Sequence, residues 1–285
     1  MAAPTPETHA GDAANPWDDV AADYDAHTSP HNAEIAEVVL DRLGLAPGAH
    51  LLDVAAGSGA LTLAAARRGM EVTAFDLSSA MIDLLRAKVA AEDLAGPVHL
   101  SVMDGQQLEL GDGSFDLAVS QFGVMSFPDL VGGIREMGRV TRPGGLVVMV
   151  TLGGLPTEVE YMAVAFDAIG AVDPEFAGVP SDPPVPPFTV ADPSALHDRM
   201  VDAGLDDVAV ERIVVPQRFP SARVLWDSIV SSNPIAGHLV AHLTEGQVAG
   251  ALAHIDAVLE ERADGDGPGA VLEAVANLGV GTTPG

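Results

Sequence analysis

The residues that could do chemistry gather in the first half of the chain, where short apolar segments end in acids. The segment LLDVAAGSGALTL carries Asp53 just before the turn Gly57-Ser58-Gly59, and Asp76 and Asp104 end the next two apolar segments. Ligands of open parallel sheets bind beyond the carboxyl ends of the strands, so these three acids are expected around one pocket. Acids beside a tight backbone turn favour a positively charged ligand.

Two common interpretations of a glycine-rich turn fit this pocket poorly. A dinucleotide site requires G-x-G-x-x-G, but Thr62 occupies the position of the third glycine. A Walker phosphate loop requires Lys-Ser/Thr after the glycines, and that pair is absent. Asp76 stands about 17 residues beyond Gly59, where an acid accepts hydrogen bonds from a ribose diol. The pattern therefore predicts a site for a positively charged nucleoside without phosphate.

The segments that position these acids alternate between strand and helix patterns. Continuous apolar runs predict five strands in the first half, over residues 50–56, 71–77, 98–104, 114–122 and 146–152. Helical spacing predicts helices over residues 16–29, 31–43, 59–69, 78–94 and 129–140, with Ser78 or Ser79 as an N-cap. This alternation indicates an α/β fold, with a doubly wound, mostly parallel sheet covered on both faces.

The second half of the chain is less regular. Its patterns predict helices over residues 156–170, 192–203 and 221–262, strands over 207–215 and 270–282, and a Pro-rich loop or lid over 173–190. The two later strands bring the sheet to seven.

Composition limits the partners and the compartment. The 285 residues are 48% hydrophobic with a formal net charge of −28, so a nucleic-acid partner is not expected because its phosphates would be repelled. The absence of cysteine excludes disulfides and thiolate chemistry. No apolar run reaches the length of a membrane span. Residues 1–15 are expected to be a disordered tail without a signal peptide, which favours a cytoplasmic protein.

Five segments together resemble a known family. LLDVAAGSG, VTAFDLSSAMI, VMDGQQL, SFDLAVSQFGVMSFPD and TRPGG are similar to the successive motifs of class I methyltransferases that use S-adenosylmethionine (SAM). The likeness covers residues 17–151 and is strongest to the branch of ubiquinone/menaquinone-pathway and natural-product small-molecule methyltransferases. It implies a Rossmann-like fold in one SAM-binding domain, residues 16–285. The core would span about 45–155, with lid and helical cap elements and a returning strand from 156.

The resemblance also implies which residues hold SAM. These are Tyr24, Asp53, Ala55, Gly57, Gly59, Asp76, Leu77, Met81, Asp104, Gly105, Gln106, Ser120 and Gln121. Asp76 would bind the ribose, Asp104 the adenine amine, and Ser120 and Gln121 would face the methionine part. Ala55 departs from the family pattern, which usually has glycine there. We expect its methyl group to be tolerated, because the position need not adopt a positive φ.

The implied activity is methyl transfer to a small, largely apolar acceptor through O, N or C. The sulfonium supplies the leaving group, so no strong catalytic signature is required, and His27 and His31 are candidates for a general base. Phe166, Phe188 and Trp226 are expected to line the acceptor pocket. His238 and His242 stand four residues apart, but no H-E-x-x-H accompanies them, so no metal site is expected.

Two other functions remain open. A protein of this fold could bind SAM without transferring methyl, as a cyclase or a binding scaffold. A nicotinamide-dependent oxidoreductase is disfavoured by the missing third glycine and by Asp53. The chain is expected to act as a monomer or homodimer.

Overall fold

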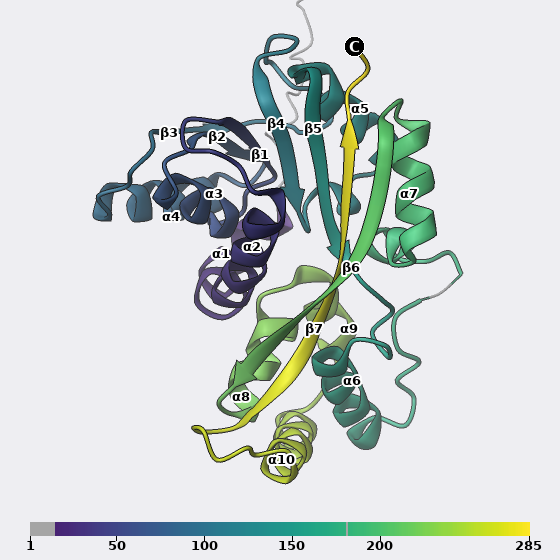
Figure 1. Cartoon of the computed structure of the whole chain (residues 1–285). Coiled ribbons are helices and arrows are strands. Elements are labelled where there is room, and N and C mark those ends of the chain that lie inside the picture. Colours follow the sequence, from purple (N-terminus) through teal and green to yellow (C-terminus); the bar gives the residue numbers. More distant parts are fainter. Residues whose placement is uncertain (1–14, 181) are drawn as a thin grey trace, which may run out of the picture.

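A computed structural model describes residues 15–180 and 182–285. Its core is a seven-stranded sheet in the order β3-β2-β1-β4-β5-β7-β6 (Figure 1). The strands are β1 (His50–Val54), β2 (Glu71–Asp76), β3 (Val98–Val102), β4 (Phe115–Gln121), β5 (Thr141–Leu152), β6 (Asp206–Phe219) and β7 (Ala270–Thr282). Neighbouring strands are parallel from β3 through β2, β1 and β4 to β5. Strand β7 runs antiparallel to both β5 and β6. This confirms the predicted doubly wound, mostly parallel sheet.

Helices cover both faces of the sheet. The helices are α1 (Pro16–Asp23), α2 (Ser29–Leu43), α3 (Ala60–Arg67), α4 (Ser79–Ala91), α5 (Leu130–Val140), α6 (Glu160–Val172), α7 (Pro193–Asp202), α8 (Ala222–Trp226), α9 (Pro234–Val240) and α10 (Glu245–Glu261). Shorter helical turns are η1 (Tyr24–Thr28), η2 (Val124–Ser126), η3 (Pro186–Val190) and η4 (Asp227–Ser231), of which η1 and η4 are π-helical. Residues of α2, α3 and α4 are buried on one face of the sheet and residues of α5 and α7 on the other.

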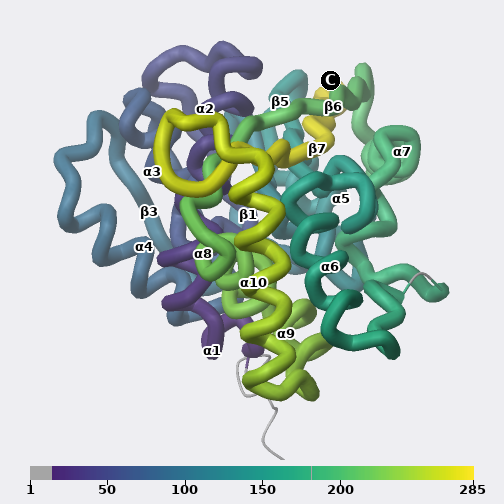
Figure 2. Tube along the Cα trace, turned by 90° about the horizontal axis from the view of Figure 1, so that it is seen from below, coloured from purple at the N-terminus to yellow at the C-terminus, as the bar shows by residue number. Residues whose placement is uncertain are grey.

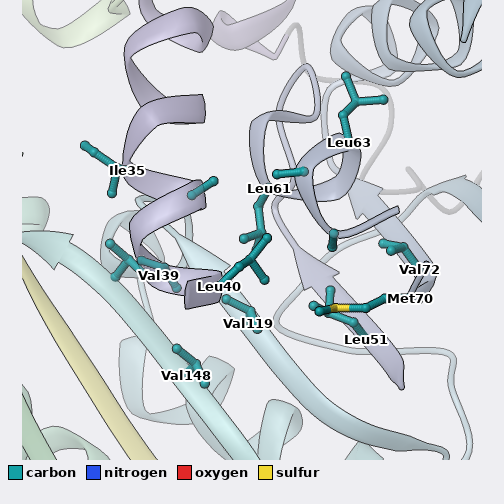
Figure 3. Packing of buried hydrophobic residues seen from close by; sticks show 14 of the residues in the cluster. Ile35, Val39, Leu40, Leu51, Leu61, Leu63, Met70, Val72, Val119 and Val148 are labelled. Carbon is teal, nitrogen blue, oxygen red and sulfur yellow. The ribbon is translucent and has the colours of Figure 1, made fainter. Parts of the chain in front are cut away.

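The apolar face of α2 is fixed by its helical spacing. Ile35, Val39 and Leu40 are buried together with Leu61 of α3 and with strand residues such as Val148 (Figure 3). Fully burying each such side chain stabilises the fold by roughly 1.5–3 kcal/mol. The N-terminal helices are therefore part of the core, and they hold the residues before α2 over the carboxyl ends of the strands.

The hairpin of β6 and β7 is longer than the rest of the sheet. Its first part pairs with β5, but β5 ends at Leu152, opposite Ala276. Beyond that point β7 pairs only with β6, as far as Ala270 opposite Phe219. Helices α6, α8 and α10 gather around this extension (Figure 1), and Figure 2 shows α10 lying beside α6. Together with α9, they form the cap.

The N-terminus departs from the expected tail in one respect. Of the residues predicted to be disordered, 1–14 lie outside the described part of the chain. Asn15 belongs to the fold, because its Oδ1 accepts a hydrogen bond from the amide of Trp17 at 3.2 Å and caps α1. None of the helices in the described part is long and apolar enough to cross a membrane.

Candidate functional site

A cavity of about 370 Å³ lies beyond the carboxyl ends of β1, β2 and β4. It has two parts. The strand-end half is lined by Tyr24, Ala55, Gly57, Asp76, Leu77, Met81, Asp104, Gly105, Gln106 and Gln121. The cap half is lined by Pro156, Tyr161, Met162, Phe166, Val179, Val185, Pro187, Phe188, Phe219, Ser228, Ile229, Asn233, Ile235, Ala236 and Leu239. Most predicted site residues therefore meet in one place.

The turn from β1 into α3 needs positive φ at three residues. Gly57 has φ 55° and Gly59 has φ 94°, and a Cβ on Gly59 would lie 2.1 Å from Cδ1 of Leu85. The third is Ala55, with φ 57°. The expectation that Ala55 avoids a positive φ is thus wrong. The turn after the strand imposes this backbone whatever residue stands there, and Ala55 adopts it at a cost of roughly 1–2 kcal/mol.

Asp53 lies behind the turn rather than in the cavity. Its side chain is 1% exposed, and its Oδ2 accepts a hydrogen bond from the hydroxyl of Thr62 at 2.6 Å. Burial raises the pKa of Asp53 to about 7, and the negative charge of Asp76 adds to that rise, while Thr62 opposes it. Asp53 and Gly59 do not line the cavity, so neither is placed to contact a ligand directly. They shape the turn instead.

Asp76 ties the two neighbouring strand ends together. Its Oδ2 accepts the amide hydrogen of Gly57 and its Oδ1 that of Ser78, both at 2.8 Å. Burial raises the pKa of Asp76, and these amide donors partly oppose the rise. The carboxylate lines the cavity and each oxygen keeps a lone pair, so it can accept two further hydrogen bonds. Ser78 is the N-cap of α4, which confirms one of the two predicted alternatives.

The turn after β3 brings three more predicted residues to the cavity. Oδ1 of Asp104 accepts the amide hydrogen of Gln106 at 2.9 Å. Gly105 lets this backbone approach Phe127 closely, since a Cβ there would lie 2.5 Å from Cζ of the phenyl ring. Oδ2 of Asp104 has no protein hydrogen bond among the described residues, so it is available to a ligand.

The two residues that end β4 play different parts. Ser120 is fully buried, donates to the carbonyl of Val54 at 2.9 Å and accepts from the amide of Val124 at 3.0 Å. It holds strands together and does not line the cavity, contrary to the expectation that it faces a ligand. Gln121 does line it. Its Nε2 donates to the carbonyl of Asn32 at 2.8 Å, and its buried Oε1 lacks a partner within the described residues.

The ring of Tyr24 packs against the glycine turn between β1 and α3. A Cβ on Gly57 would lie 3.4 Å from Cε1 of Tyr24. The phenol oxygen accepts from Nδ2 of Asn32 at 2.9 Å, which leaves the phenol hydrogen free to be donated. Burial raises the pKa of Tyr24 to about 12, so the phenol stays neutral. The backbone carbonyl of Asn32 accepts the hydrogen bond from Nε2 of Gln121, and Asn32 so links Tyr24 to the end of β4.

Several contacts that hold α1 and η1 in place were not predicted. Asp18 accepts from the hydroxyl of Ser78 at 2.5 Å and from the amide of Ala80 at 3.2 Å. Lys88 pairs with Asp25 and donates to the carbonyl of Ser58 at 3.0 Å. These contacts fasten the N-terminal helices to the turns that line the strand-end half. Sequence patterns show that these residues are polar but not which partners they meet.

The cavity-facing side of the N-terminal helices could have been found from spacing. Tyr24, Thr28, His31 and Asn32 line the cavity. Thr28 follows Tyr24 by four residues, and His31 and Asn32 follow Thr28 by three and four, which places them on one helical face. The hydroxyl of Thr28 donates to the carbonyl of Ser228 at 2.9 Å, which joins η1 to η4. Of this set, only Tyr24 and His31 were expected at the site, because Thr28 and Asn32 belong to no recognisable motif.

Two candidate bases are separated by the structure. His31 lines the cavity, and its ring stacks on Phe219 with centroids 4.6 Å apart. His27 does not line it; its Nε2 lies 3.9 Å from Oδ2 of Asp227. Of the other histidines considered, His242 donates from Nε2 to Oδ2 of Asp173 at 2.9 Å.

The cap half matches the predicted aromatic lining only in part. Phe166 and Phe188 line the cavity, but Trp226 does not. Trp226 is 4% exposed and packs inside the cap with residues such as Leu225 and Ile255. The expectation that it contacts the acceptor is therefore wrong, because α8 turns the indole toward the apolar core of the cap.

The cavity has an unbalanced charge. Two carboxylates, those of Asp76 and Asp104, line it, and none of the described lining residues is Lys or Arg. An anion in this space would meet repulsion without a compensating partner, whereas a cation would be attracted. The arrangement suits a positively charged ligand at the strand ends and an uncharged one under the cap.

Comparison with known proteins gives this site a family. Residues 52–149 match the model of a methyltransferase domain. These residues therefore form a methyltransferase domain. The chain is 36% identical over 112 residues to the ubiquinone/menaquinone biosynthesis C-methyltransferase of Geotalea daltonii, which covers 38% of this chain and 48% of that protein.

Two further comparisons extend over most of this chain. Nocamycin O-methyltransferase of Saccharothrix syringae is 28% identical over 262 residues, 82% of this chain and 91% of that protein. The crystal structure of the YcgJ protein from Bacillus subtilis has a TM-score of 0.56 at 14% identity and covers 88% and 98% of the two chains. At that identity the structure supports the fold alone. Several curated relatives are matched over only about half of their length.

Proposed function

We propose that this protein transfers the methyl group of SAM to a small, uncharged and largely apolar acceptor. The observation that carries the proposal is the charge of the cavity: Asp76 and Asp104 line its strand-end half, and no Lys or Arg is among the described lining residues. A phosphate-bearing cofactor such as NAD would be repelled there, while a nucleoside with an ammonium and a sulfonium would be attracted.

The residues of the strand-end half fit SAM group by group. Asp76 would accept the ribose hydroxyls and Asp104 the adenine amine, beside Leu77, Met81, Gly105 and Gln106. Oε1 of Gln121, which has no hydrogen-bond partner within the described part of the chain, is an acceptor suited to the ammonium. The free hydrogen of Tyr24 is a donor suited to the methionine carboxylate. When bound, SAM supplies the methyl group on a sulfonium that is already a good leaving group.

The protein's own contribution is alignment and exclusion of water. The apolar lining of the cap half, including Phe166 and Phe188, would hold the acceptor against the strand ends. Residues 16–285 would work as one unit, because Thr28 of η1 contacts Ser228 of η4 in the cap. A cytoplasmic location and a monomeric or homodimeric state remain predictions from the sequence.

Calorimetry with SAM, S-adenosylhomocysteine and NAD tests the cofactor. We expect heat with the first two and none with NAD. Tight binding of NAD without a response to SAM would overturn the proposal. The release of S-adenosylhomocysteine in the presence of apolar acceptors then separates methyl transfer from binding without transfer, as in a cyclase or a scaffold.

A further inference from the structure

Gln217 interrupts a row of apolar side chains on β6. Alternate residues of a strand share a face, and Ile213, Val215 and Phe219 of this row are buried and apolar. Gln217 takes the remaining position of the row, is only 2% exposed and lines the cavity. Burying a polar side chain costs free energy unless its polar atoms are hydrogen-bonded. The amide nitrogen and the amide oxygen of Gln217 therefore each require a partner.

The protein occupies one end of the Gln217 amide. Nε2 donates to the backbone carbonyl of His31 at 2.8 Å, and this contact fixes which end is the nitrogen, because a carbonyl can only accept. Oε1 has no hydrogen-bond partner within residues 15–180 and 182–285, yet it is not sealed inside the protein. A fixed acceptor therefore faces the cavity, and a ligand with an O–H or N–H group would supply the missing donor.

The hydroxyl group of Tyr161 belongs to the same wall of the cavity. Phe219 follows Gln217 by two residues on the same face of β6, and the ring of Tyr161 stacks on it with centroids 5.7 Å apart. Among the described residues the phenol of Tyr161 has no hydrogen-bond partner, and it too remains open to the cavity. Burial raises the pKa of Tyr161 to about 12, so the phenol stays neutral and can donate a hydrogen bond.

The surroundings of these two groups favour an uncharged aromatic ligand. Phe166 and Phe188 supply apolar walls, and the described lining residues include no Lys or Arg to bind a carboxylate or a phosphate. Apolar walls with a few polar groups that fix orientation are typical of small-molecule sites. A neutral hydroxyl group fits both polar groups, because it can donate to an amide oxygen and accept from a phenol.

We propose that Gln217 and Tyr161 together bind a neutral hydroxyl group of an aromatic methyl acceptor. Oε1 of Gln217 accepts the hydrogen of that group, and the phenol of Tyr161 donates to its oxygen. Both act as positioning residues, which orient the acceptor under the cap. The inference rests on the proposed function and narrows its substrate class to hydroxylated aromatic compounds. Hydrocarbons and ethers of the same shape are disfavoured, because they leave buried polar groups unpaired.

Three ligands that share one ring system separate the two hydrogen bonds. 2-Naphthol offers a donor and an acceptor, 2-methoxynaphthalene offers an acceptor alone, and naphthalene offers neither. Equilibrium dialysis with and without S-adenosylhomocysteine gives their dissociation constants. We expect the wild type to bind 2-naphthol about tenfold more tightly than 2-methoxynaphthalene, which leaves Oε1 of Gln217 without a donor. 2-Naphthoate should bind about tenfold more weakly than 2-naphthol, because its charge meets no Lys or Arg.

Two substitutions assign the hydrogen bonds to their residues. Gln217→Met, which is similar in size and apolar, should weaken the binding of 2-naphthol about tenfold and leave the other two ligands unchanged. Tyr161→Phe should weaken the binding of both 2-naphthol and 2-methoxynaphthalene and leave naphthalene unchanged. Gln107→Met, exposed and outside the cavity, is the matched control and should alter none of the three. A purely structural role of Gln217 would change the affinity for all three ligands alike.

The outcomes separate this inference from the proposed function. Equal affinity of the wild type for 2-naphthol and naphthalene, tighter binding of 2-naphthoate, or no binding of any naphthalene ligand would each overturn the roles of Gln217 and Tyr161 and leave SAM binding intact. Absence of SAM binding in folded wild type would overturn the proposed function, while the naphthalene ligands are still measured on the protein alone. The comparison of ligands in the wild type needs no variant, and unchanged affinity for S-adenosylhomocysteine shows that each variant has kept its fold.

Discussion

The two halves of the cavity are built in different ways. In the strand-end half, the two carboxylates of Asp76 and Asp104 follow strands within a few residues and accept hydrogen bonds from backbone amides. In the cap half, the lining comes from α6, the Pro-rich segment, β6, η4 and α9, and is mostly apolar. Local backbone rules therefore fix the first half, whereas packing between distant segments fixes the second.

This difference explains where the likeness to known proteins is concentrated. The family match covers residues 52–149, which include the turns of the strand-end half and none of the cap. A turn that must hold one cofactor tolerates few residue types, because φ, hydrogen bonding and charge are all specified. An apolar wall tolerates many, provided that volume and hydrophobicity are kept.

The largest expected effect distinguishes a residue in the apolar core of the cap from a residue that lines the cavity. Trp226→Ala should lower the free energy of unfolding by about 3–5 kcal/mol, because the indole is buried and its removal leaves a void. Phe166→Ala removes a lining side chain and should act mainly on the KM for the acceptor. Urea unfolding and initial rates measure the two effects. A larger rise in acceptor KM for Trp226→Ala than for Phe166→Ala would contradict the assignment of Trp226 to the core and of Phe166 to the cavity wall.

A pH experiment addresses the support behind the strand-end half. The pKa of Asp53 is about 7 in the folded protein against 3.8 as its ordinary value, so the folded state binds the proton more tightly. Its contribution to stability is therefore present below pH 4 and is lost as pH rises to 7. Asp53→Asn should remove this loss. At pH 8 its free energy of unfolding should exceed that of the wild type by on the order of 2–4 kcal/mol.

Unfolding at several pH values checks the Asp53 prediction. The wild type should lose stability between pH 4 and 7 relative to Asp53→Asn, and the difference should level off above pH 7. The asparagine of the variant keeps an oxygen that can accept the hydrogen bond from Thr62. The two proteins therefore differ in the charge at this position and not in that hydrogen bond. A difference that grows as the pH falls would show that Asp53 is charged in the folded state.

The next effect concerns the carboxylate that faces the ligand. Asp76→Ala should weaken SAM binding about ten- to a hundredfold, because hydrogen bonds to a charged acceptor contribute roughly 1.5–3 kcal/mol. Asp83→Ala, on the exposed surface of α4, is the matched control and should bind SAM like the wild type. Calorimetry on both variants gives the dissociation constants. Equal affinities would remove Asp76 from the site.

The smallest effect tests the strained residue of the turn. Ala55→Gly should raise stability by about 0.5–1 kcal/mol, because relief of the positive φ exceeds the entropy that glycine loses on folding. Ala87→Gly, exposed in the middle of α4, should lower stability by about 1 kcal/mol. Thermal melts of the pair should shift in opposite directions. A lower melting temperature for Ala55→Gly would mean that its methyl group packs usefully.

Sequence patterns predicted the strand-end half closely and the cap half only in outline. Asp76, Asp104 and Gly57 could be placed because strand periodicity and glycine turns are local signals. Ser120 was misplaced although its neighbour Gln121 was not, because alternation along a strand shows that the two face opposite ways but not which faces the ligand. Trp226 was misplaced because a large aromatic is equally suited to a pocket and to a core.

The amino-acid sequence by itself determined the alternation of strands and helices, the order of turns and the acids at the strand ends, since each depends on residues close together in the chain. Only the tertiary structure decided that Ala55 takes a left-handed backbone, that His31 rather than His27 faces the cavity, and that Thr28 joins the cap through Ser228. These features depend on contacts between segments up to 200 residues apart, and no local pattern specifies which distant partner a side chain will meet.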